Sequence, residues 1–150
     1  GFDRYDDAGM LARVRELGLD IAPELLAVPR VLHGITAAAA LSRTFPQIPA
    51  DVIQAIDRHT IAALDMSALD MVVYIADALE PGRTFGDVVS LRAQVGDVSL
   101  EDLFFLSYRH WLALMLERNC TLAPDTIVIW NEYAERYNQA HPRKKKKKGN

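Results

Sequence analysis

Hydrophobic residues recur at helical spacing along nearly the whole chain. The first example is the set Met10, Leu11, Val14 and Leu17, in which each residue has another three or four positions away. This spacing is expected for one buried face of an α-helix. Alternation of the kind that marks a strand is weak, and the β-branched cluster 126–129 is too short to predict one. The pattern therefore predicts an all-α domain without an internal repeat.

Capping residues and helix breakers divide this pattern into separate helices. Asp6 or Asp7 can cap the first helix, and Gly18 is well placed to end it. Ser67 is an expected N-cap, and Ser99 begins a run with capping-box spacing. The expected helices cover residues 7–17, 30–44, 49–58, 68–79, 87–94, 100–119 and 126–140, and two prolines bracket a short segment over 24–28.

Composition narrows the class of protein. The chain has 150 residues, 50% of them hydrophobic, which suits one globular domain and excludes a disordered or collagen-like chain. The single cysteine, Cys120, excludes a disulfide scaffold, and we expect it to be a buried structural thiol. No apolar run exceeds six residues, against the about 20 that span a membrane. Without a signal-peptide pattern, a cytoplasmic protein is expected.

Charge divides the chain into an acidic body and a basic tail. Six of the 17 basic residues lie in 143–148, which leaves eleven arginines against 20 acidic residues in 1–142. We therefore expect one folded domain over 1–142 and a disordered basic tail over 143–150. The tail has no interleaved aromatic residues, so nucleic acid is not an expected partner of the folded domain. The basic residues of the tail could still contact phosphate groups.

Deleting residues 143–150 is expected to leave the melting temperature unchanged. Adjacent cations repel one another and offer no apolar face, so ordering them would cost roughly 1–2 kcal/mol of backbone entropy per residue with little return. Thermal denaturation of the full and shortened chains checks this. A drop of several degrees would show that the tail docks onto the acidic body.

Four histidines are the first candidates for chemistry. His33 lies at one end of an apolar, small-residue helix, and His59 lies where a helix gives way to a loop. His110 and His141 are expected to be structural or surface residues, which is the commoner role of a lone histidine. The chain has no phosphate-binding glycine loop, no nucleophile elbow and no zinc-protease motif.

Asp77 is the second candidate. It follows the apolar run Met71–Ala76 and shares a helical stripe with Asp70 and Tyr74. We expect this helix to be buried, where a carboxylate costs several kcal/mol unless a cation or a metal pairs with it. One interpretation is a salt bridge to Arg83 or a capping role. The other is a functional cluster that Asp77 forms with the histidines.

Several short motifs occur in one order, and their combination is far more specific than any one of them. They are Leu32-His33-Gly34, His59-Thr60, Met66-Ser67, Tyr74-Ile75-Ala76-Asp77, Glu80-Pro81-Gly82-Arg83 and, near the end, Pro124, Thr126 and Asn131. The series resembles the YqeK-type family of HD-domain phosphohydrolases, the symmetrical diadenosine tetraphosphatases. The resemblance covers residues 6–131, nearly the whole expected domain.

This resemblance implies an all-α, HD-domain-like helical bundle that hydrolyses diadenosine tetraphosphate to two ADP with a divalent metal. The implied metal is iron, with manganese or cobalt as alternatives. Asp77 aligns with a metal ligand of the family. The resemblance also implies that Asp77 and His59 are the two catalytic residues. His33, His59, Thr60 and Arg83 fall on positions that bind the substrate phosphates, and the two histidines also suit a second metal.

The family has further ligands that this chain does not show. Its first metal-binding histidine and its His-Asp pair align before Gly1, so the resemblance implies an N-terminally incomplete domain. The 150-residue chain alone is accordingly expected to be inactive, since a catalytic metal usually has at least three protein ligands. A smaller departure is Ala62, where the family usually has glycine.

A second hypothesis is a non-enzymatic helical module that binds nucleotides or a partner, with the basic tail as a contact. Both hypotheses predict a nucleotide ligand and no association with a membrane. Both are compatible with a homodimer. The reading frame upstream of Gly1 separates them: a His followed some 25–35 residues later by His-Asp, just before Gly1, supports the enzyme, whereas a natural start at residue 1 contradicts it.

Overall fold

All regular structure in residues 5–84 and 86–142, which the computed structural model describes, is helical. The prediction of an all-α domain is therefore confirmed. In chain order the elements are α1 (Asp7–Glu16), α2 (Pro23–Leu26), the 3-10 helix η2 (Pro29–Leu32), α3 (His33–Thr44), α4 (Ala50–Arg58), α5 (Ala68–Ala78), α6 (Val88–Arg92), α7 (Leu100–Glu117) and α8 (Thr126–Ala140).

The expected capping residues begin and end these helices. The Asp6 carboxylate accepts a hydrogen bond from the Gly9 amide at 2.8 Å at the start of α1. Beyond the end of α1, Gly18 has a φ of +57°, which suits glycine. At the start of α5, Ser67 and Asp70 form a reciprocal capping box. Ser99 caps α7 by accepting from the Asp102 amide.

One expected helix is divided in two. Residues 30–44 were expected to form a single helix, but the first turn is the 3-10 helix η2 and α3 begins only at His33. The change of helix type falls next to Gly34, where α3 meets α4. This boundary matters for function because His33 is the first residue of α3.

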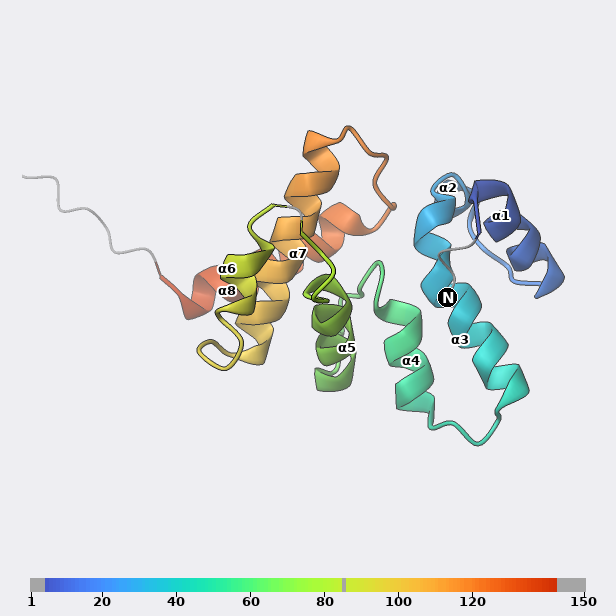
Figure 1. Cartoon of the computed structure of the whole chain (residues 1–150), viewed down its shortest axis with the longest axis horizontal. Helices are drawn as coiled ribbons and strands as arrows, with labels where there is room; N and C mark the ends of the chain where they lie inside the picture. The colour runs from blue at the N-terminus through green and yellow to red at the C-terminus, as the bar shows by residue number, and fades with distance from the viewer. Residues whose placement is uncertain (1–4, 85, 143–150) are drawn as a thin grey trace, which may run out of the picture.

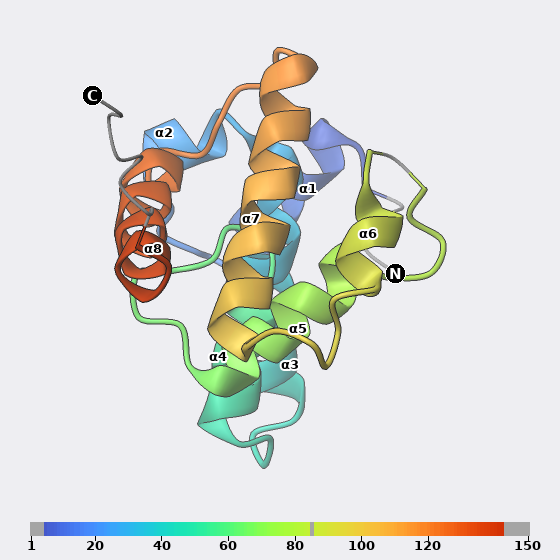
Figure 2. The same cartoon turned by 90° about the vertical axis from the view of Figure 1, so that its left-hand side faces the viewer.

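Two hydrophobic clusters hold the described residues together, one at each end of the molecule (Figure 1). The smaller is built on Met10, Val14 and Leu32 and joins α1, η2 and the start of α3. The larger gathers aromatic and aliphatic residues from α5, α6, α7 and α8, with Phe104 fully buried. Figure 2 shows α7 between α6 and α8. Helix α4 packs against α3 on one side and α5 on the other, so it connects the two clusters.

Two expectations about burial are wrong. Cys120 is exposed, because α7 ends before it and the chain turns away through Asn119, whose φ is +54°. The side chain of Asp77 is 47% exposed, although its helix carries the apolar run. On α5 the buried carboxylate is Asp70, at 0% exposure.

The predicted tail, residues 143–150, lies outside the described residues, so the domain limit at 142 stays a prediction. No helix in the described part of the chain is both long enough and apolar enough to cross a membrane.

Candidate functional site

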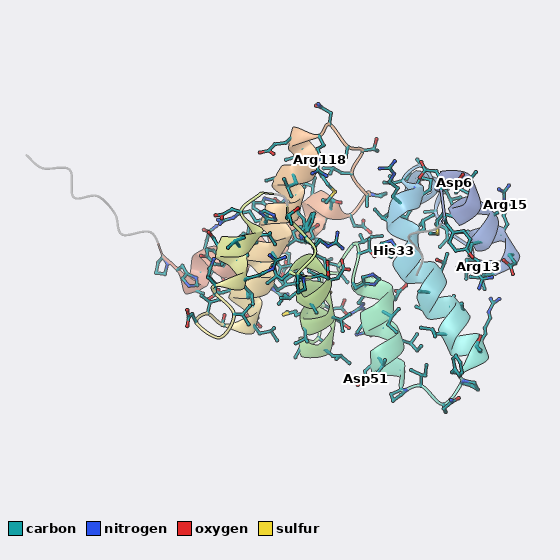
Figure 3. The ribbon with its side chains drawn as sticks, viewed as in Figure 1. Asp6, Arg13, Arg15, His33, Asp51 and Arg118 are labelled. Carbon is teal, nitrogen blue, oxygen red and sulfur yellow. The ribbon has the colours of Figure 1, made fainter. Side chains whose placement is uncertain are left out.

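His33 and His59 meet where the start of α3 crosses the end of α4. Gly34 makes the crossing possible, because a Cβ at this position would lie 2.8 Å from the carbonyl oxygen of Asp57 and 3.0 Å from that of Ile56. The Nε2 atoms of the two histidines lie 3.1 Å apart. Figure 3 shows His33 near the middle of the molecule, on the side of α3 that faces α5.

The hydrogen bonds of the two rings fix their tautomers. Nδ1 of His33 lies 2.9 Å from the Arg30 carbonyl oxygen, and Nδ1 of His59 lies 2.5 Å from that of Ile56. A carbonyl oxygen only accepts, so each Nδ1 carries a proton and donates it. In this tautomer each Nε2 is an acceptor, so the two Nε2 atoms face each other without a proton between them.

Thr60 supplies one hydrogen-bond donor for the two Nε2 lone pairs. Its hydroxyl oxygen lies 3.0 Å from Nε2 of His33 and 3.4 Å from Nε2 of His59. One hydroxyl donates one proton, so it can satisfy one of the two nitrogens. The remaining lone pair suits a proton or a cation, and histidine Nε2 held by an Nδ1–H···O=C bond is a common metal-ligand arrangement.

Asp77 and Arg83 form an ion pair at the C-terminal end of α5. The Arg83 guanidinium donates from Nη2 to the Asp77 carboxylate at 2.8 Å and from Nε to the Asp77 carbonyl at 3.0 Å. Its Cζ atom also lies 5.1 Å from the centre of the Trp111 ring, a favourable cation–π distance. The salt bridge considered for Asp77 from the sequence is therefore present.

Arg92 holds the turn that carries Arg83. From α6 its guanidinium donates to the carbonyl oxygens of Leu79 at 2.9 Å, Glu80 at 2.5 Å and Arg83 at 2.7 Å. These carbonyls follow the end of α5, where backbone acceptors have no helical partner and a cation is favourable. Arg83 is thus anchored through its backbone as well as its side chain.

The end of α4 is tied to the start of α5 by a buried charge pair. Arg58, next to His59, donates to the Asp70 carboxylate at 3.0 Å. Burial alone would raise the pKa of Asp70, but hydrogen bonds from the Ser67 backbone, Gln54 and Arg58 outweigh it and lower that pKa. Asp70 therefore stays ionised and holds the α4 terminus that carries His59.

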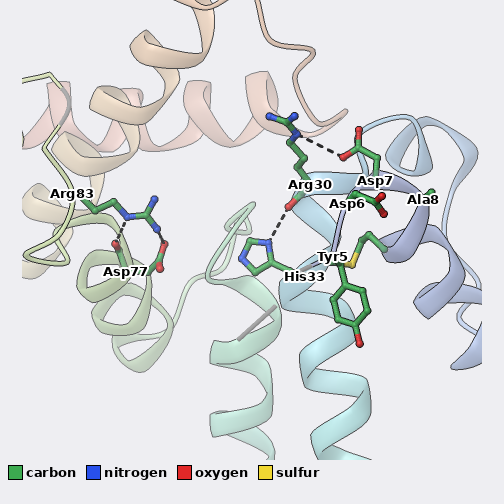
Figure 4. A pocket seen from close by; sticks show the side chains of 9 residues that line it. Tyr5, Asp6, Asp7, Ala8, Arg30, His33, Asp77 and Arg83 are labelled. Atoms are coloured by element: carbon green, nitrogen blue, oxygen red, sulfur yellow. Dashed lines mark hydrogen bonds and ion pairs between the residues drawn. The ribbon is translucent and has the colours of Figure 1, made fainter. Parts of the chain in front are cut away.

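Four of the residues singled out in the sequence line one pocket of about 210 Å³: His33, His59, Asp77 and Arg83. A wider cleft of about 670 Å³ adjoins it and shares His33, Asp77 and Arg83. In Figure 4, His33 faces this cleft opposite the Asp77–Arg83 pair. Thr60 also lines the smaller pocket. The other two histidines lie elsewhere: His141 pairs with Asp102 at 3.4 Å, and His110 packs against Trp111.

No family model matches the chain, but its sequence is similar to those of two curated enzymes. The symmetrical bis(5'-nucleosyl)-tetraphosphatase of Staphylococcus aureus is 29% identical over 136 residues, which cover 88% of this chain and 69% of that protein. Its counterpart in Bacillus subtilis is 27% identical over 103 residues, 69% of this chain and 55% of that protein.

One solved structure has a fold similar to that of this chain. It is a predicted HD superfamily hydrolase involved in NAD metabolism from Clostridium acetobutylicum, with a TM-score of 0.76 and 26% identity over 89% of this chain and 70% of that one. The chain is similar to symmetrical tetraphosphatases in sequence and to an HD superfamily hydrolase in fold. Its aligned part spans between about half and 70% of these proteins.

HD superfamily hydrolases, to which the chain is similar, generally depend on a divalent metal, and the described residues fit such an ion in part. Two imidazole nitrogens 3.1 Å apart suit neighbouring ligands of one cation. However, the described part of the chain contains no group of three or more His, Cys, Asp or Glu side chains able to hold one metal. Asp77 therefore does not complete a three-ligand set with His33 and His59.

One charged residue of the wider cleft, Arg30, was missed from the sequence. It lines the cleft beside His33. Its carbonyl orients His33, and its guanidinium forms a 3.6 Å ion pair with Asp7. The signal that was available is its position three residues before His33, one turn of a 3-10 helix. It adds a second arginine to the cleft, opposite Arg83.

Proposed function

We propose that this chain is a metal-dependent phosphohydrolase that cleaves dinucleoside polyphosphates, with diadenosine tetraphosphate giving two ADP. The observation that carries the proposal is the meeting of His33, His59, Asp77 and Arg83 around one pocket. These residues are far apart in the sequence, and together they supply imidazole, carboxylate and guanidinium groups. The relatives named above are tetraphosphatases, which gives the substrate class.

Each residue has a proposed role that follows from its chemistry. The Arg83 guanidinium binds a phosphate, because it is planar, permanently charged and matched to phosphate oxygens. His33, His59 and Thr60 hold the phosphates from the opposite wall. A phosphate that takes the place of the Asp77 carboxylate on Arg83 frees that carboxylate for the cation accompanying the substrate. Asp77 and His59 are thus the proposed catalytic residues.

We further propose that the cation is iron, with manganese or cobalt as alternatives. Asp77 would hold one ion, and the Nε2 atoms of His33 and His59 are suited to a second. When bound, such an ion lowers the pKa of a coordinated water and neutralises phosphate charge. The chain's own residues fix the phosphates by charge and by hydrogen bonds.

The test measures hydrolysis by the 150-residue chain and by any longer product that its reading frame encodes upstream of Gly1. We expect the latter to convert diadenosine tetraphosphate to ADP as the sole nucleotide product in the presence of iron, manganese or cobalt. The 150-residue chain is expected to be far slower, because its described residues do not supply three metal ligands. Product analysis by chromatography separates ADP from the AMP and ATP of asymmetric cleavage.

Three outcomes decide the matter. AMP and ATP as products contradict the symmetrical reaction, and full turnover by the 150-residue chain contradicts the proposed need for further ligands. Tight nucleotide binding without hydrolysis by either protein favours the non-enzymatic module instead. A homodimer, contacts of the basic tail and a cytoplasmic location stay predictions.

A further inference from the structure

The smaller pocket has an apolar wall that the proposed phosphate chemistry does not use. Val31 comes from η2, Tyr74 from α5, and Trp111 and Met115 from successive turns of α7. This wall faces the same space as His33, His59 and Arg83. A neighbouring small pocket shares Val31, Tyr74 and Met115. The apolar wall therefore continues along the side of α7, away from the charged groups.

Tyr74 places one polar atom in this wall. The residue is only 5% exposed, and its ring packs against Phe104 at 5.1 Å and Tyr108 at 6.1 Å between ring centres. The residue lines both small pockets, and its hydroxyl is not one of the fully buried unsatisfied atoms of the described residues. Burial raises the pKa of Tyr74, so the hydroxyl keeps its proton and can donate it to a ligand.

Trp111 connects the apolar wall to the phosphate groups. It is half-buried, lines the pocket and lies in cation–π contact with Arg83. A planar aromatic ring in such a position is the usual support for a nucleobase, since every base presents a π-face that stacks without requiring a particular sequence. A base on this wall leaves its phosphates beside Arg83.

We propose that the wall formed by Val31, Tyr74, Trp111 and Met115 binds the nucleobase of a nucleotide. The base stacks in the pocket against Trp111, and a polar atom of the nucleoside accepts a hydrogen bond from the Tyr74 hydroxyl. This inference rests on the proposed function, because it assigns a place to the part of the substrate that the phosphate site does not hold.

The two cavity sizes agree with this division. Pockets that bind drug-sized ligands have volumes of about 300–1,000 Å³. The apolar pocket, at about 210 Å³, is below that range and suits part of a nucleotide, whereas the adjoining cleft of about 670 Å³ lies within it. One base and the polyphosphate chain thus have separate spaces that share His33, Asp77 and Arg83.

The experiment measures binding of three probes to the 150-residue chain by isothermal titration calorimetry: adenosine, ADP and inorganic triphosphate. Tyr74→Phe removes only the hydroxyl and no hydrogen bond that the described residues make, so the fold is expected to persist. We expect it to weaken adenosine and ADP about fivefold, the value of one neutral hydrogen bond, and to leave triphosphate unchanged. Trp111→Leu is expected to weaken adenosine about tenfold or more.

Matched controls separate binding from stability. Tyr133→Phe makes the same change at a buried tyrosine outside the pocket, whose hydroxyl bonds to the Met66 amide and the Leu64 carbonyl. It is expected to lower the melting temperature without changing the Kd of adenosine. Leu116→Ala removes an exposed side chain next to Met115 and is expected to change neither quantity, whereas Met115→Ala is expected to weaken adenosine.

The outcomes distinguish this inference from the proposed function. If adenosine does not bind and ADP binds no more tightly than triphosphate, the nucleobase pocket is wrong and the phosphate site stands. Equal affinity of adenosine for the wild-type chain, Tyr74→Phe and Trp111→Leu also overturns it. If adenosine binds as expected but ADP binds no better than adenosine, the pocket stands and the proposed phosphate chemistry is contradicted.

Discussion

Replacing Asp70 with alanine is expected to lower the free energy of unfolding by about 3 kcal/mol, because it breaks a buried ion pair and leaves its partner unmatched. The lost carboxylate oxygen accepts hydrogen bonds from Gln54 at 2.9 Å, Arg58 at 3.0 Å and the Ser67 amide at 2.9 Å. The change also removes half of the capping box at the start of α5. Urea denaturation followed by circular dichroism measures the difference.

Asp65 provides a matched control for this prediction. It is the other acidic partner of Arg58, at 3.2 Å, but its side chain is 80% exposed. Asp65→Ala is expected to cost less than about 1 kcal/mol, as is usual for exposed ion pairs. Equal losses in the two variants would show that burial of Asp70 does not determine its contribution.

Ionisation of the Asp70 carboxylate is expected to make the free energy of unfolding depend on pH. The hydrogen bonds it accepts overcome the effect of burial and hold its pKa below the ordinary value. The folded state therefore favours the ionised carboxylate. This contribution is complete above the ordinary aspartate pKa of about 3.9 and is lost as the pH falls through the lower folded value. Asp70→Asn is expected to be less stable at neutral pH and to lose less on acidification.

In whichever form of the protein hydrolyses diadenosine tetraphosphate, Asp77→Ala is expected to abolish both hydrolysis and metal retention. Arg83→Ala is expected to keep the metal and raise KM. The two residues are partners at 2.8 Å, so a purely structural pair would give two similar variants. The proposed roles give different ones, because the carboxylate holds the cation and the guanidinium holds phosphate. ADP release and metal content per chain after dialysis are the two measurements.

Loss of stability is not expected to obscure this comparison. The side chains of Asp77 and Arg83 are 47% and 32% exposed, and breaking such a pair typically costs under about 1 kcal/mol. Asp97→Ala, at an exposed position on a loop, serves as a control with full activity and metal content. An Asp77→Ala protein with wild-type rate and metal content would contradict the catalytic assignment.

Local patterns in the sequence predicted the helices well because their ends depend on nearby residues. Ser67, Ser99 and Asp6 act within three residues of themselves, through hydrogen bonds to the backbone amides that start a helix. The sequence marked 24–28 only as a short segment between prolines, and the structure forms the helix α2 there, with Pro23 in its first turn. The boundary at His33 was missed because it depends on how closely α3 approaches α4.

The burial of Asp77 was predicted wrongly for a similar reason. The run Met71–Ala76 is apolar, but a helix at a surface buries only one side. Val72, within that run, is 50% exposed, while Asp70 and Tyr74 are buried. Asp77 is one position away from the buried Ala78 and lies on the open side. The meeting of His33 and His59 was suggested by the family resemblance, and its cause is the absence of a side chain at Gly34.

The two walls of the cleft belong to different hydrophobic clusters, so we expect the site to assemble only when both clusters are formed. His33 is joined to the smaller cluster through Leu32, whereas Asp77 and Arg83 lie beside the larger one. Few buried residues form the smaller cluster, so we expect the N-terminal helices to open at a lower free energy than global unfolding requires. Opening would part the two walls of the cleft. A nucleotide that bridges those walls binds only the closed arrangement and stabilises it by mass action, so substrate would also act as a local folding ligand.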